Sequence, residues 1–580
     1  MDMVNVKVNG IAVSVPKGST ILEAAHAAGV EIPTLCYLKD INEIGACRIC
    51  VVEATGARGL VTACVYPVAE GMEIQTNTDK VRAARKTTLE LILSTHEKKC
   101  LSCVRSTNCE LQKLCLDYGV EDNGKYDGFH PEYALDESAP HMIRDNNKCI
   151  LCRRCVAACQ QQFVSVIGAN DRGIDTHIAC AFEKPLGDVP CVSCGQCINV
   201  CPTGALREKD NTAEVFEALS DPDKIVLVQT APAVRAAIGE EFGLPIGTPC
   251  EGKMVAALRR LGFDKVFDTD FGADMTIVEE ATELVDRVKN GGVLPMITSC
   301  SPGWVKFAEL YYPDQLANLS TCKSPQQMFG AILKTYYAEK NGIDPRNIVS
   351  VSVMPCTAKK FELTREDEDA AGMPDVDISI TTRELARMIR RAGLNFTALP
   401  DEEFDMPLGA DTGAAVIFGA TGGVMEAALR TANDVLTGKD NGSVDFTEVR
   451  GMEGLKEATY NIAGLEVKVA VASGLTAANH VMSKIKDGTA PWTFVEIMCC
   501  PGGCINGGGQ PIVPAVVRNF ENYRAKRAKV LYDMDRDMPL RKSHQNPMVV
   551  EIYKDYFESF GSHKAHEVLH THYTARKKFR

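Results

Sequence analysis

The chain has 580 residues, a mass of 63.0 kDa and a formal net charge of −13, from 63 basic and 76 acidic residues. At about 150 residues per domain, this length predicts roughly four domains. The hydrophobic and charged fractions, 45% and 24%, exclude a mostly disordered chain, a collagen and a coiled coil. The acidic balance excludes a whole-chain basic field for nucleic acid. The most informative figure is 24 Cys, most of them in closely spaced groups.

The start of the chain predicts a compartment. The segment MDMVNVKVNG alternates like a strand and lacks the basic region and apolar core of a signal peptide. No stretch approaches the ~18 apolar residues of a membrane span. We therefore expect a cytoplasmic protein without a membrane span, in which thiols stay reduced. Clustered Cys in that compartment indicate metal sites rather than disulfides.

The predicted elements begin with a small α+β unit. Alternating strands flank Asn9-Gly10, a strong hairpin signal, and Thr20 caps the helix that follows. An amphipathic helix then runs into His96, and a short Cys-dense segment follows a polar linker. These changes in composition and in predicted secondary structure indicate four domains, over residues 1–79, 80–125, 139–208 and 220–580.

The last of these domains predicts a largely parallel α/β sheet. Apolar strands such as VLPMITS, NIVSVSVMP and TFVEIM alternate with helical segments. Cys300 and Cys356 directly follow the first two strands, and Cys500 follows the third after one further Cys. Because open α/β sheets bind ligands at the carboxyl ends of their strands, we expect these thiols at one edge of the sheet.

The first group of Cys predicts a [2Fe–2S] cluster. Its members are Cys36, Cys47, Cys50 and Cys64. Four thiolates suit such a cluster, and a structural zinc site is the alternative. The adjacent hairpin and helix resemble a plant-type ferredoxin domain of β-grasp fold, which favours the cluster, although the Cys spacing is wider than the plant-type one.

The second group combines one His with three Cys. Its members are His96, Cys100, Cys103 and Cys109. One imidazole and three thiolates can hold zinc or an iron cluster. Alone, His96 would be an ordinary residue at a helix end, but its position before a CxxC pair predicts a His/Cys3 [4Fe–4S] domain.

The third group is the most specific motif of the chain. Two runs follow the two-cluster bacterial ferredoxin pattern, in which the fourth Cys of each run ligates the other cluster. One [4Fe–4S] cluster is therefore assigned to Cys149, Cys152, Cys155 and Cys201. The other is assigned to Cys191, Cys194, Cys197 and Cys159. Zinc sites favour paired CxxC knuckles over such triple runs, so a zinc-rich scaffold is disfavoured.

Three further motifs indicate the site to which these clusters would pass electrons. They are PMITSCSPGW (295–304), MPCTAKKFE (354–362) and EIMCCPGGCINGGGQP (496–511). Together they resemble the signature motifs of the iron–iron hydrogenases. The resemblance covers nearly the whole chain and is close to the large clostridial type and to catalytic subunits of NAD(P)-linked complexes. It implies a multidomain α+β chain that ends in a two-lobed α/β catalytic domain with a small-subunit-like segment over about 520–580.

The resemblance also implies a six-iron H-cluster, in which a [4Fe–4S] cubane shares a thiolate with a two-iron unit bearing CO and cyanide. The cubane ligands implied by the motifs are Cys356, Cys500 and the bridging Cys504. The residues implied beside the two-iron unit are Lys359, as a donor to cyanide, Met354 and Met498. Without the resemblance, the Lys would be a surface charge and the two Met would be core residues.

A proton relay is the remaining part of the implied site. Cys300 matches the thiol that exchanges protons at the two-iron unit, and Glu280, Ser320 and Glu283 match the path to solvent. Such a relay is required because a buried reaction centre must exchange protons with water. Without the resemblance, the two Glu residues would be assigned to a solvated helix face.

The sequence departs from the family pattern at one cubane ligand. The first family motif usually has two adjacent Cys, whereas this chain has Cys300-Ser301. Ser301 could itself ligate through its oxygen, but an alkoxide is a poor match for a soft iron–sulfur site. The missing thiolate could come from Cys300, Cys322 or Cys499, with Cys322 preferred, or both of the last two could be ordinary buried Cys.

The resulting functional prediction is an iron–iron hydrogenase that catalyses 2H+ + 2e− ⇌ H2. Electrons would pass through one [2Fe–2S] and three accessory [4Fe–4S] clusters, from ferredoxin or NAD(P)-binding flavoprotein subunits. One alternative is a slow hydrogen-sensing regulator, which Cys300 disfavours and Ser301 keeps open. The other is a non-catalytic electron-transfer subunit, in which the three last motifs would have no use.

Overall fold

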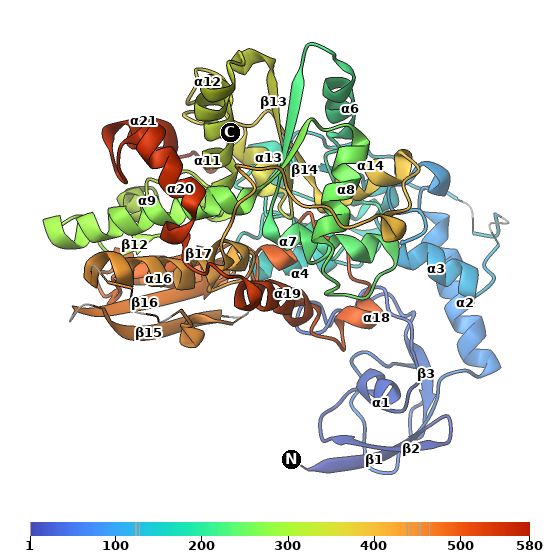
Figure 1. Cartoon of the computed structure of the whole chain (residues 1–580). Helices are drawn as coiled ribbons and strands as arrows, with labels where there is room; N and C mark the ends of the chain where they lie inside the picture. The colour runs from blue at the N-terminus through green and yellow to red at the C-terminus, as the bar shows by residue number, and fades with distance from the viewer. Residues whose placement is uncertain are drawn as a thin grey trace.

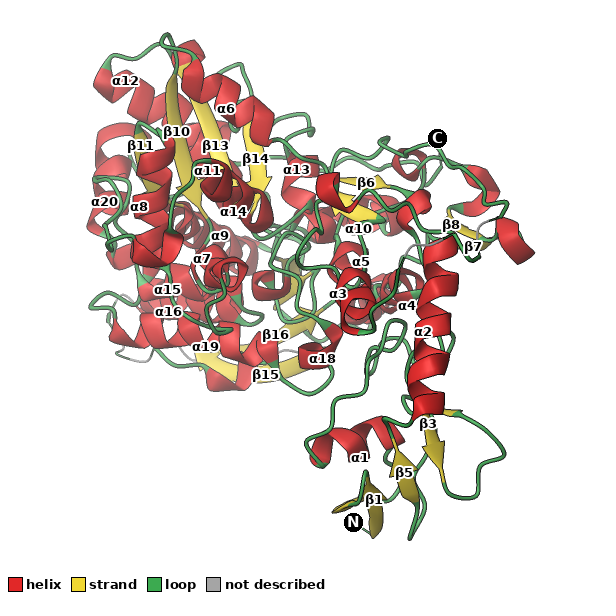
Figure 2. Cartoon of the chain, turned by 90° about the vertical axis from the view of Figure 1, so that its right-hand side faces the viewer, coloured by secondary structure: helices red, strands yellow, loops and turns green. Residues whose placement is uncertain are grey.

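The computed structural model describes residues 2–579 except 122, 123, 127, 438, 441, 443, 452, 453, 463 and 464. A small N-terminal unit projects from one end of a larger body, and the long helix α2 (Asp79–Ser94) joins the two (Figures 1 and 2). Across the described part of the chain, no helix is both long and apolar enough to cross a membrane.

The N-terminal unit is a five-stranded sheet with one short helix. Its elements are β1 (Met3–Val8), β2 (Ile11–Pro16), α1 (Ile21–Ala27), β3 (Val51–Ala54), β4 (Val61–Thr62) and β5 (Glu73–Gln75), in the sheet order β2-β1-β5-β3-β4. The predicted hairpin is present, and both turn residues, Asn9 and Gly10, have positive φ. The predicted cap is also confirmed, because Thr20 and Glu23 form a capping box.

The middle segment has short elements that hold Cys-bearing loops. They are α3 (Glu110–Asp117), β6 (Met142–Arg144), α4 (Arg154–Gln161), β7 (Gly168–Asn170), β8 (His177–Ala179), α5 (Gln196–Asn199) and β9 (Leu206–Glu208). Strands β6 and β9 pair antiparallel, as do β7 and β8. Helices α4 and α5 each begin directly after a left-handed residue, Arg153 and Gly195, so each CxxC loop turns sharply before its helix.

The remaining chain forms two sheets. The first is fully parallel, with β10 (Ile225–Thr230), β11 (Lys265–Asp268), β13 (Ile348–Met354) and β14 (Ile378–Thr381) in the order β11-β10-β13-β14. The second contains β12 (Met296–Ile297), β15 (Gly454–Ile462), β16 (Leu465–Ser473) and β17 (Phe494–Met498) in the order β12-β17-β16-β15. Only β15 is antiparallel to its neighbour.

The expectation that three strands of one sheet deliver thiols to one edge is therefore wrong. Cys300 and Cys500 follow strands of the second sheet, whereas Cys356 follows β13 of the first sheet. The hydrophobic periodicity and the apolar composition of the strand sequences are the same in both sheets. These two features therefore do not reveal which strands pair.

Helices cover and connect the two sheets (Figure 1). The longer ones are α6 (Thr212–Ser220), α8 (Glu251–Leu261), α9 (Thr269–Asn290), α10 (Pro302–Tyr311), α11 (Pro325–Ile332), α14 (Thr382–Arg391), α16 (Gly423–Thr437), α17 (Leu475–Lys486) and α19 (Tyr523–Asp537). Shorter ones include α7 (Pro232–Arg235), α12 (Ala338–Asn341), α13 (Ala358–Glu362), α15 (Gly413–Val416), α18 (Ala515–Arg518), α20 (Pro547–Ile552) and α21 (His563–Leu569).

Helix α9 is the element that links the two cores. One of its faces, which includes Phe271 and Met275, packs into a core with α11 and the C-terminal helices. Another face, with Ala273 and Ile277, packs into a core with α16 and the second sheet. A helix that is covered on both sides buries polar residues as well, and Glu280 is only 1% exposed.

Candidate metal and catalytic centre

The four Cys of the first group lie together in the N-terminal unit. Cys50 Sγ is 3.3 Å from Cys64 Sγ, and the Cys47 N–H donates to Cys36 Sγ at 3.5 Å. The neighbouring Cys50 thiol and burial raise the pKa of Cys64, as expected when thiol groups crowd one pocket. Four neighbouring thiols, some of whose sulfur atoms accept backbone N–H groups, fit a [2Fe–2S] cluster.

Two Cys of the His-containing group, Cys103 and Cys109, lie close together. Cys103 packs against Gly204, because a Cβ atom at Gly204 would lie 2.6 Å from Cys103 Sγ. The charge of Cys103 contributes to raising the pKa of Cys109. Burial lowers the pKa of His96, and its Nδ1 is buried with no hydrogen-bond partner among the described residues. A neutral imidazole with an unused ring nitrogen has the protonation state that a metal ligand requires.

The fourth Cys of each triple run lies near Cys residues of the other run. Cys201 lies near Cys149 and Cys152, because their mutual charges affect the pKa of the two thiols. Cys159 lies near Cys191 and Cys194, because the charges of these two thiols raise its pKa. The fourth Cys of each run is therefore placed with the first Cys residues of the other run.

This crossing leads to a paired prediction. Replacing Cys159 with Ala is expected to remove the cluster of the second run, and replacing Cys201 with Ala should remove that of the first. The direct test is Mössbauer or EPR spectroscopy of the two variants, each matched to the other. Loss of the first-run cluster in the Cys159 variant would contradict the crossed assignment.

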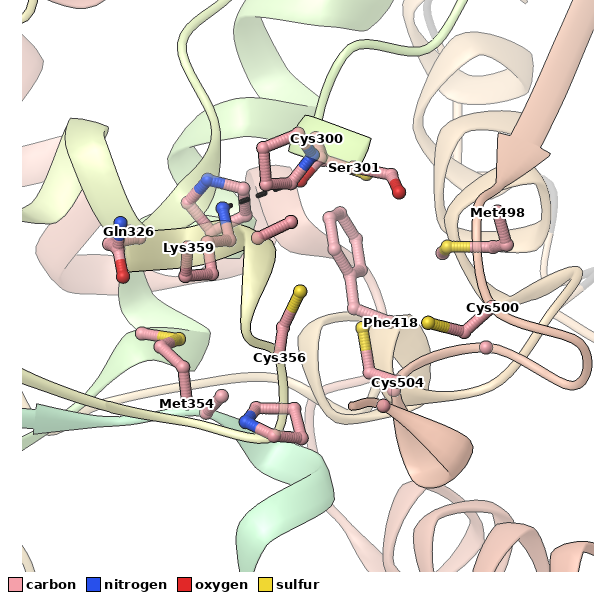
Figure 3. Close-up of a pocket in the computed structure, with 18 of the residues that line it drawn as sticks. Cys300, Ser301, Gln326, Met354, Cys356, Lys359, Phe418, Met498, Cys500 and Cys504 are labelled. Carbon is pink, nitrogen blue, oxygen red and sulfur yellow. Dashed lines mark hydrogen bonds between the residues drawn. The ribbon is translucent and has the colours of Figure 1, made fainter. Parts of the chain in front are cut away.

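The last three motifs meet at a cavity between the two sheets. Figure 3 shows Cys356, from the loop after β13, and Cys500 and Cys504, from the segment after β17, with their side chains in the same cavity. Burial and the neighbouring thiols raise the pKa of Cys356 and also that of Cys504, to about 12. The other walls are mostly apolar. They include Met354, Met498, Phe418, Pro232 and Pro355.

This donor set fits the implied cubane in part. Thiolates in a dry, apolar cavity suit an iron–sulfur cluster, and Gly507 lets backbone pass closely, since a Cβ there would lie 2.1 Å from the Pro355 carbonyl oxygen. Only three of the four cubane thiolates are among the residues that the family motifs assign. Ser301 stands at the fourth position and lines the same cavity.

Lys359 reaches the cavity from α13. Its Nζ donates to Ser324 Oγ at 2.7 Å and to Glu362 Oε2 at 2.9 Å, and it lies 3.4 Å from the Cys300 carbonyl oxygen (Figure 3). The ammonium group is thus charged, buried and held in place by a carboxylate. The Glu362 partner could have been found from the sequence, because it lies three residues further along the same helix.

The four residues of the predicted relay form a line from the cavity toward the surface. The Cys300 thiol lines the cavity, and burial and the Glu280 carboxylate raise its pKa. Ser320 Oγ donates to Glu283 Oε2 at 2.9 Å, and Glu283 pairs with Arg287 at 2.5 Å. The line therefore ends at an ion pair that is only partly buried.

Glu280 has the most perturbed environment in this line. Burial and then the charge of Glu283 raise its pKa to about 8. Neither carboxyl oxygen has a hydrogen-bond partner among the described residues, although Ser320 and the backbone of Ser299 lie close enough to offset part of the pKa rise. A solvated helix face, the alternative from sequence, does not describe this residue.

Cys322 does not reach the cavity. Its thiol is 3.8 Å from Glu283 Oε2, and its side chain packs in the core beside Phe271 and Met328. It is absent from the cavity lining, which does contain Cys499. The preference for Cys322 as the missing ligand is therefore not supported by its position.

The sequence did not predict how closely the second triple run approaches this cavity. Cys194 belongs to the second triple run and also lines the cavity. Its neighbour Gly195 packs against Gly508, where a Cβ on Gly195 would lie 2.8 Å from the Gly508 Cα. No local pattern in either segment indicates this contact, because the two glycines are far apart in the sequence.

Five segments of the chain match known families. The family described as "Iron only hydrogenase large subunit, C-terminal domain" matches residues 224–508, and "Iron hydrogenase small subunit" matches 521–576. Three iron–sulfur families match the preceding part. They are a 2Fe-2S cluster binding domain at 1–79, the NADH-ubiquinone oxidoreductase-G iron–sulfur region at 85–123 and a 4Fe-4S dicluster domain at 148–205.

Individual proteins agree with this assignment. The chain is 49% identical to the NADP-reducing hydrogenase subunit HndD of Solidesulfovibrio fructosivorans, over the whole of both chains. It is 44% identical to iron hydrogenase 1 of Clostridium pasteurianum, covering 98% of this chain and all of that protein. A solved structure of an [FeFe]-hydrogenase HydA1 variant from Chlamydomonas reinhardtii aligns with a TM-score of 0.57 and 40% identity, covering 64% of this chain and all of that one. The chain therefore belongs to the iron-only hydrogenase family, with iron–sulfur domains that precede the catalytic domain.

Proposed function

We propose that this hydrogenase catalyses 2H+ + 2e− ⇌ H2 at an H-cluster whose cubane is held by Cys356, Cys500 and Cys504. The observation that carries the proposal is the buried cavity where these thiols converge beside Cys300, the first member of a line of proton-exchanging groups. The bound six-iron group would supply the redox chemistry on hydrogen, and the protein supplies position, dryness and protons.

The relay residues divide the proton transfer into short steps. With a pKa of about 8, Glu280 is mostly protonated at neutral pH and can donate to a Cys300 thiolate. The Ser320 hydroxyl can accept a proton on one side and donate on the other, as its bond to Glu283 shows in one direction. Glu283, which is only partly buried, can then exchange the proton with water.

Lys359, Met354 and Met498 form the wall around the proposed two-iron unit. The Lys359 ammonium is held by Glu362 and Ser324, so it is already oriented for a ligand that accepts hydrogen bonds. The two thioether side chains exclude water from the same space, which strengthens every polar contact inside it.

Electrons would reach this site along four accessory clusters, one [2Fe–2S] in the β-grasp unit and three [4Fe–4S]. Cys194 at the cavity wall supports the last step of that path. The name of the relative HndD, an NADP-reducing hydrogenase subunit, supports a complex linked to NADP. The proposed partners are an NAD(P)-binding flavoprotein subunit or ferredoxin, and the proposed compartment is the cytoplasm. The catalytic region would be two-lobed, one lobe around each of its two sheets.

Infrared spectroscopy of the anaerobically matured chain, with a viologen hydrogen assay on the same sample, tests this function. We expect CO and cyanide stretching bands together with fast turnover. Bands with very slow turnover would instead support a hydrogen-sensing regulator. Absence of bands after competent maturation would contradict the hydrogenase proposal and leave an electron-transfer role.

A further inference from the structure

The cubane of the proposed H-cluster lacks one ligand among the residues assigned by motif. Three thiols, those of Cys356, Cys500 and Cys504, enter the cavity, and Ser301 stands where the family motif has a fourth Cys. A cubane held by the protein needs four ligands, and a hard alkoxide is poorly matched to its soft iron. A further thiol that reaches the same corner of the cavity is therefore required.

Ser301 and Cys499 are in direct contact at that corner. The backbone N–H of Cys499 donates to Ser301 Oγ at 3.2 Å, so the hydroxyl already has a partner. Cys499 directly follows β17, and Ser301 directly precedes α10, so two distant segments meet at this bond. The backbone of residue 499 therefore lies within one hydrogen bond of the side chain at the position that the usual ligand occupies.

The Cys499 side chain also faces the proposed ligands. It lines the cavity, is 4% exposed, and its thiol interacts with those of Cys500 and Cys194. Gly303 provides the space, because a Cβ there would lie 2.7 Å from Cys499 Sγ. The thiol therefore stands between the cubane ligands and the last accessory cluster.

The other candidate thiols are placed differently. Cys300 is an electrostatic neighbour of Glu280, which fits proton exchange, and its use as a ligand would remove the only relay thiol in the described cavity lining. Cys322 contacts Glu283 and does not line the cavity.

We propose that Cys499 supplies the fourth thiolate of the cubane in place of Ser301, an inference that rests on the proposed H-cluster. Relative to the usual family motif, the ligand Cys would stand directly after β17 instead of directly before α10. The cavity would therefore still provide four sulfur ligands. Because the Cys499 thiol also contacts that of Cys194, the exchange would place a cubane ligand in direct contact with a thiol assigned to the neighbouring accessory cluster.

The direct test places selenium at the proposed ligand. In a matured chain with Cys499→Sec as its only change, X-ray absorption at the selenium edge should show iron bonded directly to selenium. The matched control is Cys250→Sec, a buried thiol that bonds to the Thr248 carbonyl oxygen and should show no iron neighbour. A wild-type sample with an intact cubane, combined with a Cys499→Sec sample that has no bonded iron, would overturn the inference.

Substitutions give an independent readout. Cys499→Ala should lower the cubane signal in Mössbauer spectra by about tenfold or more, while the accessory clusters remain. The double variant Ser301→Cys with Cys499→Ala should restore the cubane, because it returns the ligand to the usual position. Cys322→Ala should keep it. An intact cubane in Cys499→Ala, or its loss in Cys322→Ala, would contradict the assignment.

These outcomes remain separate from those of the proposed function. If wild-type chain shows neither CO and cyanide bands nor a cubane, the hydrogenase proposal fails. If wild type shows both, and only the selenium and substitution results are negative, the hydrogenase proposal stands and the ligand assignment fails.

Discussion

Replacing Glu280 with Gln is expected to lower hydrogen turnover by about 10²- to 10⁴-fold, the usual contribution of a positioned acid or base. Gln has the same shape but cannot release or take up a proton on the timescale of turnover. Since the Glu280 oxygens have no hydrogen-bond partner among the described residues, the substitution breaks no described bond. The infrared bands and the cubane spectrum should therefore be unchanged.

The neighbouring residue on α9 provides a matched control. Glu279 is also buried, but it accepts hydrogen bonds from Tyr553, from the Gly561 N–H and, through its other oxygen, contacts His570 at 3.1 Å. These partners belong to the C-terminal segment rather than to the relay. Glu279→Gln should keep most of the turnover, and a loss as large as that of Glu280→Gln would mean that α9 has been disturbed as a whole.

The pH dependence gives this prediction a second readout. Burial raises the pKa of Glu280 to about 8, so the residue is protonated below that pH and can deliver protons. Above it, the carboxylate form is better suited to accept them. Hydrogen evolution measured at constant driving force should therefore fall as pH rises through about 8, and this inflection should be absent in the residual activity of Glu280→Gln. Turnover of the variant close to that of wild type would remove Glu280 from the path.

The parts of the site that were predictable from sequence are those whose geometry is local. The spacing within each triple run determines which thiols can share a cluster, and the structure groups Cys201 with Cys149 and Cys152 as expected. His96 could be recognised only because a CxxC pair follows it at short range. The hairpin at Asn9-Gly10 likewise depends on two adjacent residues.

The parts that were missed depend on contacts between distant segments. Strand pattern does not reveal that β13 belongs to a different sheet from β12 and β17. Closeness in sequence favoured Cys322, two residues after Ser320, whereas the fold brings Cys499 to Ser301 across nearly two hundred positions. Long-range pairing of this kind depends on the packing of whole elements and leaves no signal in a short window of sequence.

The second large effect is expected at Glu208, which joins the accessory-cluster segment to the catalytic region. Glu208 lies on β9 and accepts from Arg383 and Arg387 at 2.7 Å each. Arg383 also donates to the carbonyl oxygens of Gly508, at 2.7 Å, and Gln510, at 2.5 Å. One buried carboxylate thus holds a guanidinium that fixes the glycine-rich loop beside the cavity.

Glu208→Gln should destabilise this contact by about 3–5 kcal/mol, because it leaves two guanidinium groups without their buried counter-charge. Hydrogen exchange of the Gly509 and Gln510 amides, which donate to the Pro355 and Gly507 carbonyl oxygens, reports opening of the loop directly. A matched surface pair is Lys113 with Asp117, at 2.7 Å and largely exposed. Asp117→Asn should change exchange at the loop by less than about 1 kcal/mol.

The same carboxylate makes the contact depend on pH in a defined direction. The nearby Arg383 and Arg387 outweigh the effect of burial and hold the pKa of Glu208 far below its usual value. Its stabilising contribution is complete above the unfolded pKa of about 4.3 and is lost progressively as pH falls below it. Protection of the Gln510 amide in wild type should therefore weaken on acidification, while Glu208→Gln should be poorly protected throughout. Equal protection in both proteins at neutral pH would show that Asn199 and the loop carbonyl oxygens hold Arg383 without the carboxylate. The approach of Gly195 to Gly508 would then not depend on Glu208.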